Sequence, residues 1–426
     1  MSEKLCLISL GCDKNLVDSE MLLGYISENQ KCDYEFTDDE KAADVIIINT
    51  CCFILDSKQE SIDTILRVAE YKLSGKLKKL IIMGCLAERY KDEIIKEIPE
   101  VDMVIGIPEF EDAMEKYHPK NRILSTGGWY AYLKIAEGCN KRCTYCIIPY
   151  LRGNYKSYPM EDLLDQAKKL AEGGVKELIL VAQETTLYGV DIYGKKMLPE
   201  LLRKLCLIDG LRWIRLMYTY PEEITDELIE VIASEKKICH YIDMPIQHAS
   251  DTILKRMGRL TDRADIENII DKLRTNIPDI VIRTSLISGF PGETDADHRI
   301  LVDFVDSTEL ERVGVFTYSP EEGTPAETYP DQISQEIKEA RRDEIMSLQQ
   351  EISAAFLDSL IDTELEVMVE GWLPDDDVAI GRTYMDAPGV DGYIFINTKK
   401  RYDSGTFLKV RVTGSSEYDL IGEEIS

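Results

Sequence analysis

Hydrophobic and polar positions in residues 1–125 alternate between short apolar runs and longer amphipathic segments. The apolar runs cover 5–10, 44–49, 79–83 and 101–105, and the amphipathic segments cover 16–29, 57–73 and 87–98. Short apolar runs are typical of buried strands, whereas helices need longer periodic segments. Strands that alternate with helices predict a parallel sheet with helices on both faces. We therefore expect an α/β domain over residues 1–125.

The same alternation resumes between residues 126 and 358. Six strand-like runs lie at 130–136, 177–182, 213–217, 239–244, 280–287 and 312–317, with helical runs between them such as 160–172, 198–207 and 296–308. Six such units predict a partial (β/α)6 barrel. A final acidic helix over 334–359 is expected to close this barrel, with Arg341 and Arg342 in solvent.

The pattern changes again in residues 359–426. Residues 364–370 alternate between polar and apolar side chains, and similar short runs follow at 379–383, 392–396, 407–413 and 419–423. Turn residues such as Pro388-Gly389 and Ser404-Gly405 separate them. Five short strands predict a small antiparallel β-barrel. The expected fold class is thus α/β followed by a small all-β domain.

Charge and composition limit the partners of this chain. Its formal net charge is −29 over 426 residues, and residues 361–426 alone hold 14 acidic and 6 basic side chains. Such a surface repels nucleic acid and attracts basic proteins, although an acidic host proteome would give the same composition. No apolar run approaches the roughly 18 residues of a membrane span. With no secretory pattern visible at Met1, we expect a cytoplasmic protein whose 11 cysteines stay reduced.

Three closely spaced cysteines are the first candidate for chemistry. Cys139, Cys143 and Cys146 form a C-x3-C-x2-C triplet directly after a strand-like run. Three thiolates can hold three corners of a 4Fe–4S cluster and leave one iron open. An open iron is what S-adenosylmethionine (SAM) needs for reductive cleavage. A structural zinc site or inert thiols are the alternatives, but no fourth Cys or His lies close by in the sequence.

Three further cysteines each follow one of the first three strand-like runs. Cys12, Cys51 and Cys85 would lie at the carboxyl edge of one parallel sheet, where open α/β folds bind ligands. This placement predicts a second cluster with its own open iron, although cysteine is also a common buried residue. Cys52 is a competing thiol, and we assign Cys51 because it is nearer to the strand end.

Polar residues follow the strands of the second domain in the same way. Gln183, Glu184 and Thr185 follow the second strand, and Gln247 and His248 follow the fourth. Gly289, within Ser288–Gly292, follows the fifth. We expect this edge to hold the amino-acid and ribose ends of SAM, with Gln183, Glu184, Thr185, Gln247 and Gly289 as ligands. Turn formation and loop capping are the alternative roles.

Taken together, these motifs resemble those of the radical-SAM methylthiotransferase family. The resemblance covers almost the whole chain and rests on three segments: residues 9–20 (SLGCDKNLVDSE), Cys146–Pro149 with Arg152-Gly153, and Gly381–Gly392 (GRTYMDAPGVDG). It implies an N-terminal methylthiotransferase domain, a radical-SAM barrel and a C-terminal TRAM domain. The chain departs from the family pattern at Asp13, where proline is usual, and at Cys52, where glycine is usual.

The resemblance implies two 4Fe–4S clusters and SAM as cofactors. Cys139, Cys143 and Cys146 would hold the cluster that cleaves SAM to a deoxyadenosyl radical, which takes a hydrogen from an unactivated carbon. Cys12, Cys51 and Cys85 would hold the auxiliary cluster, whose sulfur is methylated by a second SAM and passed to that carbon.

Within the family the chain is most similar to the branch that modifies the β-carbon of an aspartate in ribosomal protein S-twelve of the small subunit, on the ribosome or free. A flavodoxin or ferredoxin would donate electrons. Three alternatives remain: a transfer-RNA adenosine methylthiotransferase of the same family, which the acidic charge disfavours; a non-catalytic iron–sulfur carrier; and a zinc-bound RNA-binding protein.

Overall fold

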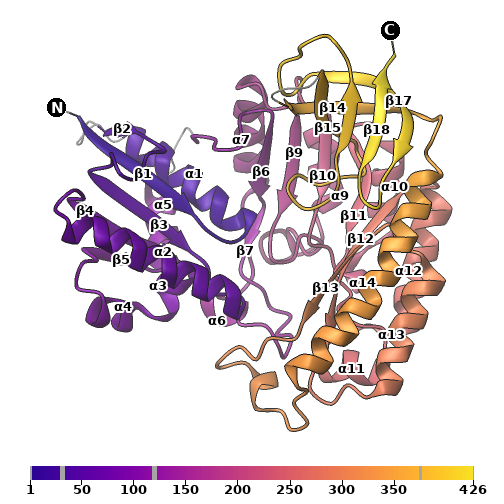
Figure 1. Cartoon of the computed structure of the whole chain (residues 1–426), viewed down its shortest axis with the longest axis horizontal. Helices are drawn as coiled ribbons and strands as arrows, with labels where there is room; N and C mark the ends of the chain where they lie inside the picture. The colour runs from indigo at the N-terminus through magenta and orange to yellow at the C-terminus, as the bar shows by residue number, and fades with distance from the viewer. Residues whose placement is uncertain (1, 29–33, 118–121, 374–376, 426) are drawn as a thin grey trace. The chain divides into compact units, whose positions relative to one another are not determined.

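The computed structural model describes residues 2–28, 34–117, 122–373 and 377–425 and divides into two compact units (Figure 1). The first, which we call the cysteine unit, comprises Met1–Ser125, Glu137–Lys156 and Ser319–Glu327. The second, the barrel unit, comprises Thr126–Ala136, Ser157–Tyr318 and Thr328–Ser426. The chain passes between the units at the short strands β7 (Ala136–Glu137) and β8 (Lys156–Ser157) and near the 3-10 turn Pro325–Thr328.

A five-stranded parallel sheet forms the centre of the cysteine unit, in the order β2-β1-β3-β4-β5. Its strands are β1 (Glu3–Ser9), β2 (Tyr34–Phe36), β3 (Val45–Thr50), β4 (Lys79–Gly84) and β5 (Met103–Ile105). The helices are α1 (Asp13–Glu28), α2 (Leu55–Leu73), α3 (Cys85–Arg89), α4 (Lys91–Glu97), α5 (Ile107–Tyr117) and α6 (Ile148–Leu151). The predicted α/β sheet is confirmed, but sequence reasoning missed β2, and the single helix expected over 87–98 is wrong because α3 ends before Tyr90 and α4 begins after it.

Strand β3 shows why the sheet carries helices on both faces. Ile46 and Ile48 pack into a core with α2, α3 and α4, whereas Val45 and Ile47 pack into a second core with α1 and α5. Successive strand side chains point to opposite faces. A continuous apolar run therefore fills two cores at once.

The barrel unit contains a six-stranded parallel sheet in the order β13-β12-β11-β10-β9-β6. Its strands are β6 (Tyr130–Lys134), β9 (Glu177–Val181), β10 (Trp213–Leu216), β11 (Ile238–Asp243), β12 (Val281–Ser288) and β13 (Arg312–Thr317). The helices are α7 (Met160–Glu172), α8 (Val190–Tyr193), α9 (Leu198–Cys206), α10 (Asp226–Ser234), α11 (Asp251–Arg256), α12 (Arg263–Asn276), α13 (Asp295–Thr308) and α14 (Gln335–Asp358), with a 3-10 turn at Pro221–Glu223. Six parallel strands with helical connections confirm the predicted partial barrel.

The C-terminal strands close into the small barrel that the sequence predicts. They are β14 (Glu364–Trp372), β15 (Val378–Arg382), β16 (Ile394–Asn397), β17 (Phe407–Ser415) and β18 (Leu420–Glu424), in the order β14-β15-β16-β18-β17. The expectation of a purely antiparallel barrel needs one correction, because β16 and β18 pair in parallel. Among the helices described, none is both long and apolar enough to cross a membrane.

The segment Gly381–Gly392 binds the C-terminal barrel to the amino-terminal ends of the six-stranded sheet. Arg382 is fully buried and donates to Glu177, the first residue of β9, at 2.6 Å between Nη2 and Oε2. Glu177 also accepts from Arg215 of β10 at 2.7 Å. Burial works to raise the pKa of Glu177, but the guanidinium groups of Arg382 and Arg215 outweigh it and hold this pKa below its usual value.

Two further charged residues of the same segment make contacts of this kind. Asp386 accepts from Arg312 of β13 at 2.8 Å, and Asp391 accepts from the hydroxyl of Tyr241 in β11 at 2.8 Å. The amino-terminal ends of barrel strands are where stability is built, whereas chemistry occupies the opposite ends. This family motif therefore works as a structural anchor in the barrel unit.

Candidate active site

Three cysteines gather at the carboxyl edge of the sheet in the cysteine unit. Cys12 follows β1, Cys51 follows β3 and Cys85 follows β4, and these three strands are immediate neighbours. Thr50 and Gly84 are paired in register, so Cys51 and Cys85 leave the sheet side by side. The structure thus brings together the three residues that the sequence placed on one edge. We call them the strand-end cysteines.

Glycine at two positions allows the strand ends to approach this closely. Gly11 has φ +85°, and a Cβ there would lie 2.5 Å from Cys51 Cβ and 2.8 Å from its Sγ. Gly84 has φ +93°, and a Cβ there would lie 2.2 Å from Oδ1 of Asn49. A side chain at either position would combine backbone strain with a direct clash. The Cys51 thiol therefore packs against the loop that carries Cys12.

Cys51 and Cys52 lie in different surroundings. Burial, and to a smaller extent the charge of Cys12, raise the pKa of the Cys51 thiol. Cys52 is fully buried in the apolar core with α2 and α3, and burial raises its pKa to about 12. These surroundings favour Cys51 as the thiol that faces Cys12, and Cys52 as a core residue.

The second group of thiols is also in the cysteine unit. Cys139 and Cys143 are buried, and the Cys139 amide donates to the carbonyl of Gly153 at 3.2 Å. The chain turns back at Cys143, whose carbonyl accepts from the Cys146 amide at 3.0 Å. Burial and then the charges of the other two thiols raise the pKa of Cys146 to about 12. All six predicted cysteines therefore belong to one compact unit.

The spacing of the sulfur atoms bears on which metal group would fit. Tetrahedral zinc binds thiolates at about 2.3 Å, which places its sulfur ligands roughly 3.8 Å apart. In neither cysteine group do all three Sγ atoms lie within 4.8 Å of one another; among the residues that the structure describes, only the acidic group Asp18, Glu111 and Glu137 meets that limit. Two groups of three thiols at wider spacing fit a larger metal cluster better than a single zinc ion.

In the barrel unit, the polar residues after β9 are held by contacts at the strand end. The Thr185 hydroxyl donates to the carbonyls of Met217 and Tyr218 at 2.8 and 3.0 Å, and Oε1 of Glu184 accepts from the Thr186 amide at 2.9 Å. Glu184 and Thr185 are buried, while Gln183 is partly buried. These contacts fix the local backbone, and the role of the three residues toward SAM stays a prediction.

Gln247 also lies at the carboxyl edge of this sheet. Its backbone has φ +74° and pairs with β12, because its amide donates to Ser285 at 2.9 Å and its carbonyl accepts from Ile287 at 2.8 Å. Its side chain is partly buried. A left-handed backbone is unusual for a residue other than glycine, and here it stands where the chain after β11 pairs in parallel with β12. Its predicted contact with SAM stays a prediction.

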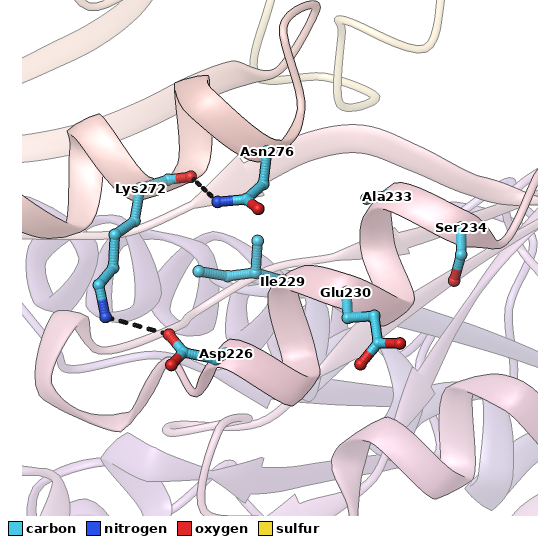
Figure 2. A pocket seen from close by; sticks show the side chains of 7 residues that line it. All are labelled: Asp226, Ile229, Glu230, Ala233, Ser234, Lys272 and Asn276. Atoms are coloured by element: carbon cyan, nitrogen blue, oxygen red, sulfur yellow. Dashed lines mark hydrogen bonds and ion pairs between the residues drawn. The ribbon is translucent and has the colours of Figure 1, made fainter.

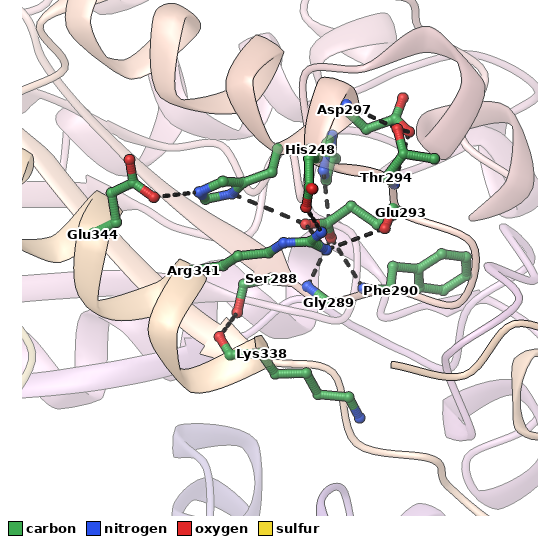
Figure 3. Close-up of polar contacts among 12 residues, drawn as sticks. His248, Ser288, Gly289, Phe290, Glu293, Thr294, Asp297, Lys338, Arg341 and Glu344 are labelled. Carbon is green, nitrogen blue, oxygen red and sulfur yellow. Dashed lines mark hydrogen bonds and ion pairs between the residues drawn. The ribbon is translucent and has the colours of Figure 1, made fainter. Parts of the chain in front are cut away.

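Glu293 and Arg341 lie beside the predicted Gly289 position, and the sequence interpretation missed their contacts there (Figure 3). Oε2 of the buried Glu293 accepts from the amides of Gly289 and Phe290 at 2.7 and 3.1 Å, and Oε1 accepts from Nη1 of Arg341 at 3.0 Å. The expectation that Arg341 is solvated is therefore wrong, because its guanidinium turns inward to a buried carboxylate. Glu293 and α14 together fix the Gly289 loop.

Gly289 itself approaches α14 closely. It has φ +71°, and a Cβ there would lie 2.2 Å from Cγ of Lys338. The Ser288 hydroxyl donates to the Lys338 carbonyl at 2.9 Å. His248 is fully buried with Nε2 3.7 Å from Oε2 of Glu293. The sequence signal for this arrangement is the helix start at Thr294, whose capping box with Asp297 shows that Glu293 precedes a helix.

Surface pockets of the structure lie away from these groups. One of about 490 Å³ lies between α10 and α12, where Lys272 pairs with Asp226 at 3.0 Å (Figure 2). Helix α10 packs against β11 and against α12, and the pocket opens to solvent. It holds none of the predicted site residues.

Comparison with known proteins agrees with this combination of groups. The family description "Uncharacterized protein family UPF0004" matches residues 4–106, "Radical SAM superfamily" matches 133–305, and "TRAM domain" matches 361–425. The chain is 58% identical to the protein named ribosomal protein uS12 methylthiotransferase RimO of Lachnoclostridium phytofermentans, over 98% of this chain and 99% of that protein. The chain belongs to the RimO family of radical-SAM methylthiotransferases.

Further comparisons support the same family and fold. Proteins named RimO from Acetivibrio thermocellus and Clostridioides difficile are 50% and 47% identical, over 100% and 99% of this chain and 99% and 98% of each relative. Among solved structures, the radical SAM methyltransferase TsrM of Kitasatospora setae has a TM-score of 0.54 at 14% identity, over 76% of this chain and 77% of that one. The SAM radical enzyme OxsB has a TM-score of 0.52 at 13% identity, over 82% of this chain and 56% of that one. At such low identity these two structures show the fold alone.

Proposed function

We propose that this enzyme adds a methylthio group to the β-carbon of an aspartate in ribosomal protein uS12. The observation that carries the proposal is the full-length identity of 58% to a protein named for that reaction, together with six cysteines in two groups of three. The acidic charge agrees with it, because a basic ribosomal protein is attracted to such a surface. A ribosomal substrate would place the reaction in the cytoplasm.

Two iron–sulfur clusters would be held by the cysteine unit. We assign Cys139, Cys143 and Cys146 to the cluster that binds SAM, and Cys12, Cys51 and Cys85 to the auxiliary cluster. Each assigned group has three cysteines, which agrees with one open iron in each cluster. When bound, the clusters and SAM would supply the radical and sulfur-transfer chemistry, which side-chain acids and bases cannot supply.

The residues of the barrel unit would bind and orient SAM. We assign this role to the carboxyl-edge residues Gln183, Glu184, Thr185, Gln247 and Gly289. Glu293 would act through the Gly289 loop, because it holds the two amides that set the path of the loop. A loop fixed in this way lowers the cost of ordering the site when the ligand binds.

The transfer-RNA reaction of related enzymes is the main alternative. Binding RNA requires many Lys and Arg contacts to phosphates, and residues 361–426 carry 14 acidic against 6 basic side chains. The charge therefore favours a protein substrate. A flavodoxin or ferredoxin is the class of electron donor that we propose, since the first cluster must be reduced before SAM is cleaved.

The deciding experiment supplies both substrates to the same enzyme. Anaerobically reconstituted protein, SAM, a reductant and sulfide are incubated with small ribosomal subunits or with transfer RNA, and products are analysed by mass spectrometry. We expect one methylthio group on uS12, on its aspartate, and none on RNA. Cys143→Ala is the control and should abolish SAM cleavage. Modification of RNA alone would contradict the proposal, and a protein with six intact cysteines that never cleaves SAM would favour the cluster-carrier alternative.

A further inference from the structure

Arg152 is a buried cation that lies among carboxylates in the cysteine unit. Its side chain is 1% exposed, and Nη1 donates to Oε2 of Glu137 at 2.8 Å. Both Nη atoms lie 3.4 Å from Oδ2 of Asp18, and Nη2 donates to Oδ1 of Asn15 at 2.5 Å. A guanidinium held by three partners has one orientation.

Asn15, the neutral partner of Arg152, holds the strand ends that carry the cysteines. Its Nδ2 donates to the carbonyl of Leu10 at 3.0 Å and to that of Thr50 at 3.1 Å. These carbonyls lie just before Cys12 and Cys51. The Sγ of Cys85 is 3.9 Å from the same Oδ1 that accepts from Arg152. One side chain therefore connects Arg152 to Cys85 and to the strand ends that precede Cys12 and Cys51.

The backbone next to Arg152 contacts the other cysteine group. The carbonyl of Gly153 accepts from the Cys139 amide at 3.2 Å. Gly138 packs so closely on this segment that a Cβ there would lie 2.6 Å from the Gly153 oxygen and 2.3 Å from the Asn154 oxygen. Arg152 and its neighbours thus link the two groups of thiols, through Asn15 on one side and the Gly153 backbone on the other.

Arg152 keeps its positive charge in these buried surroundings. Burial acts to lower its pKa, but the carboxylate of Glu137, followed by the charges of Cys85 and Asp18, holds this pKa well above its usual value. Asn15 contacts both the guanidinium and the Sγ of Cys85 through the same oxygen. The cation is therefore separated from a strand-end cysteine by one side chain.

We infer that Arg152 is a positioning residue that supplies the counter-charge of the auxiliary cluster and fixes that cluster relative to the cysteine triplet. This inference rests on the cluster assignments of the proposed function. Net charge and hydrogen bonding around the ligands set the reduction potential of an iron–sulfur cluster. Because reduction adds a negative charge, a nearby cation favours the reduced state and a nearby carboxylate opposes it.

Two substitutions at this site should therefore move the potential in opposite directions. Arg152→Met removes the cation and should make the auxiliary cluster at least tenfold harder to reduce, a shift of about 59 mV to more negative potential. Asp18→Asn removes a contacting carboxylate with little change in shape and should shift the potential to more positive values. Arg152→Lys keeps the positive charge, so the potential of the auxiliary cluster in this variant should stay near the wild-type value.

The measurement is a redox titration with a reductant and mediator dyes, followed by electron paramagnetic resonance. The auxiliary signal is identified as the one that Cys12→Ala abolishes. Arg67→Met serves as the matched control, because Arg67 is a cation of the same unit that pairs with Glu40 at the surface. It should leave the potential unchanged.

Opposite shifts with iron content retained would support the inference. Shifts of the same sign, or shifts below twofold (about 18 mV) in both Arg152→Met and Asp18→Asn, would overturn it. If Arg152→Met fails to fold, the direction of the potential shift in Asp18→Asn still decides. A wild-type protein that binds only about four irons would overturn the proposed function and this inference together, whereas eight irons with unmoved potentials would overturn the inference alone.

Discussion

Arg382→Met removes the buried cation that anchors the C-terminal barrel. The Arg382 side chain is fully buried and makes three bonds, to Glu177 at 2.6 Å, to Glu370 at 2.8 Å and to the Asp386 carbonyl at 2.8 Å. Methionine fills similar space but leaves these oxygens without their donor. Removing one partner of a buried ion pair costs about 3–5 kcal/mol. At about 2 °C per kcal/mol, the melting temperature should fall by roughly 6–10 °C.

Thermal unfolding of the cluster-free protein, followed by circular dichroism, measures this effect without interference from iron. Arg212→Met is the matched control, because Arg212 pairs with Glu366 of the same C-terminal barrel while its side chain is 57% exposed. An exposed pair contributes about 0–1 kcal/mol, so this variant should melt within about 2 °C of wild type.

A double-mutant cycle with Glu177→Gln separates the pair from its surroundings. Residues that share a buried ion pair show a coupling of about 0.5–3 kcal/mol. An Arg382→Met variant that melts like Arg212→Met would refute the reasoning, as would additive effects of the two substitutions. Either result would mean that the fully buried charges add nothing to the anchor.

Three other predictions concern the site itself. Cys51→Ala should halve the iron bound after reconstitution. Cys52→Ala should keep the iron content near wild type and cost about 1 kcal/mol of stability, because it leaves a small cavity. Equal losses of iron in the two variants would contradict the assignment of Cys51. Gly11→Ala should also lower iron content, because its Cβ would meet Cys51 at 2.5 Å, and a full complement of iron would refute that packing. Glu293→Gln should weaken SAM binding about tenfold, in line with the roughly 1.5–3 kcal/mol of a charged hydrogen bond. Asp295→Asn changes the exposed partner of Arg341 and should alter SAM affinity less than twofold. If calorimetry finds the same SAM affinity for Glu293→Gln and Asp295→Asn, the loop role of Glu293 is excluded.

Local patterns predicted much of this architecture. The run Val45–Ile48 is apolar at every position, so it identifies a buried strand without any knowledge of its neighbours. Cys12, Cys51 and Cys85 could be placed together because parallel strands end at a common edge. This placement already predicted a second cluster, and the family resemblance then supplied the reaction.

What the sequence did not reveal depends on distant partners. Tyr34–Phe36 is too short to show a strand period, and it forms β2 because β1 offers a free edge. Arg341 has the local appearance of a solvated helix residue, and its burial depends on distant partners, above all the buried carboxylate of Glu293. Arg382 is matched by Glu177, which lies 205 positions earlier in the chain. Such pairings follow from packing and carry no periodic signal.

The membership of Glu137–Lys156 in the cysteine unit has a consequence for exchanging parts between relatives. The radical SAM description begins at residue 133, so it assigns this segment to the barrel. A chimera joined at that boundary would take Asn15 from one parent and Arg152 from the other. It would also separate Cys139 from residues 1–125, which belong to the same compact unit. Chimeras that move residues 137–156 together with residues 1–125 should load iron more completely than chimeras cut at 133. The segment that the family description matches and the compact unit differ here, and the compact unit is the safer one to transplant.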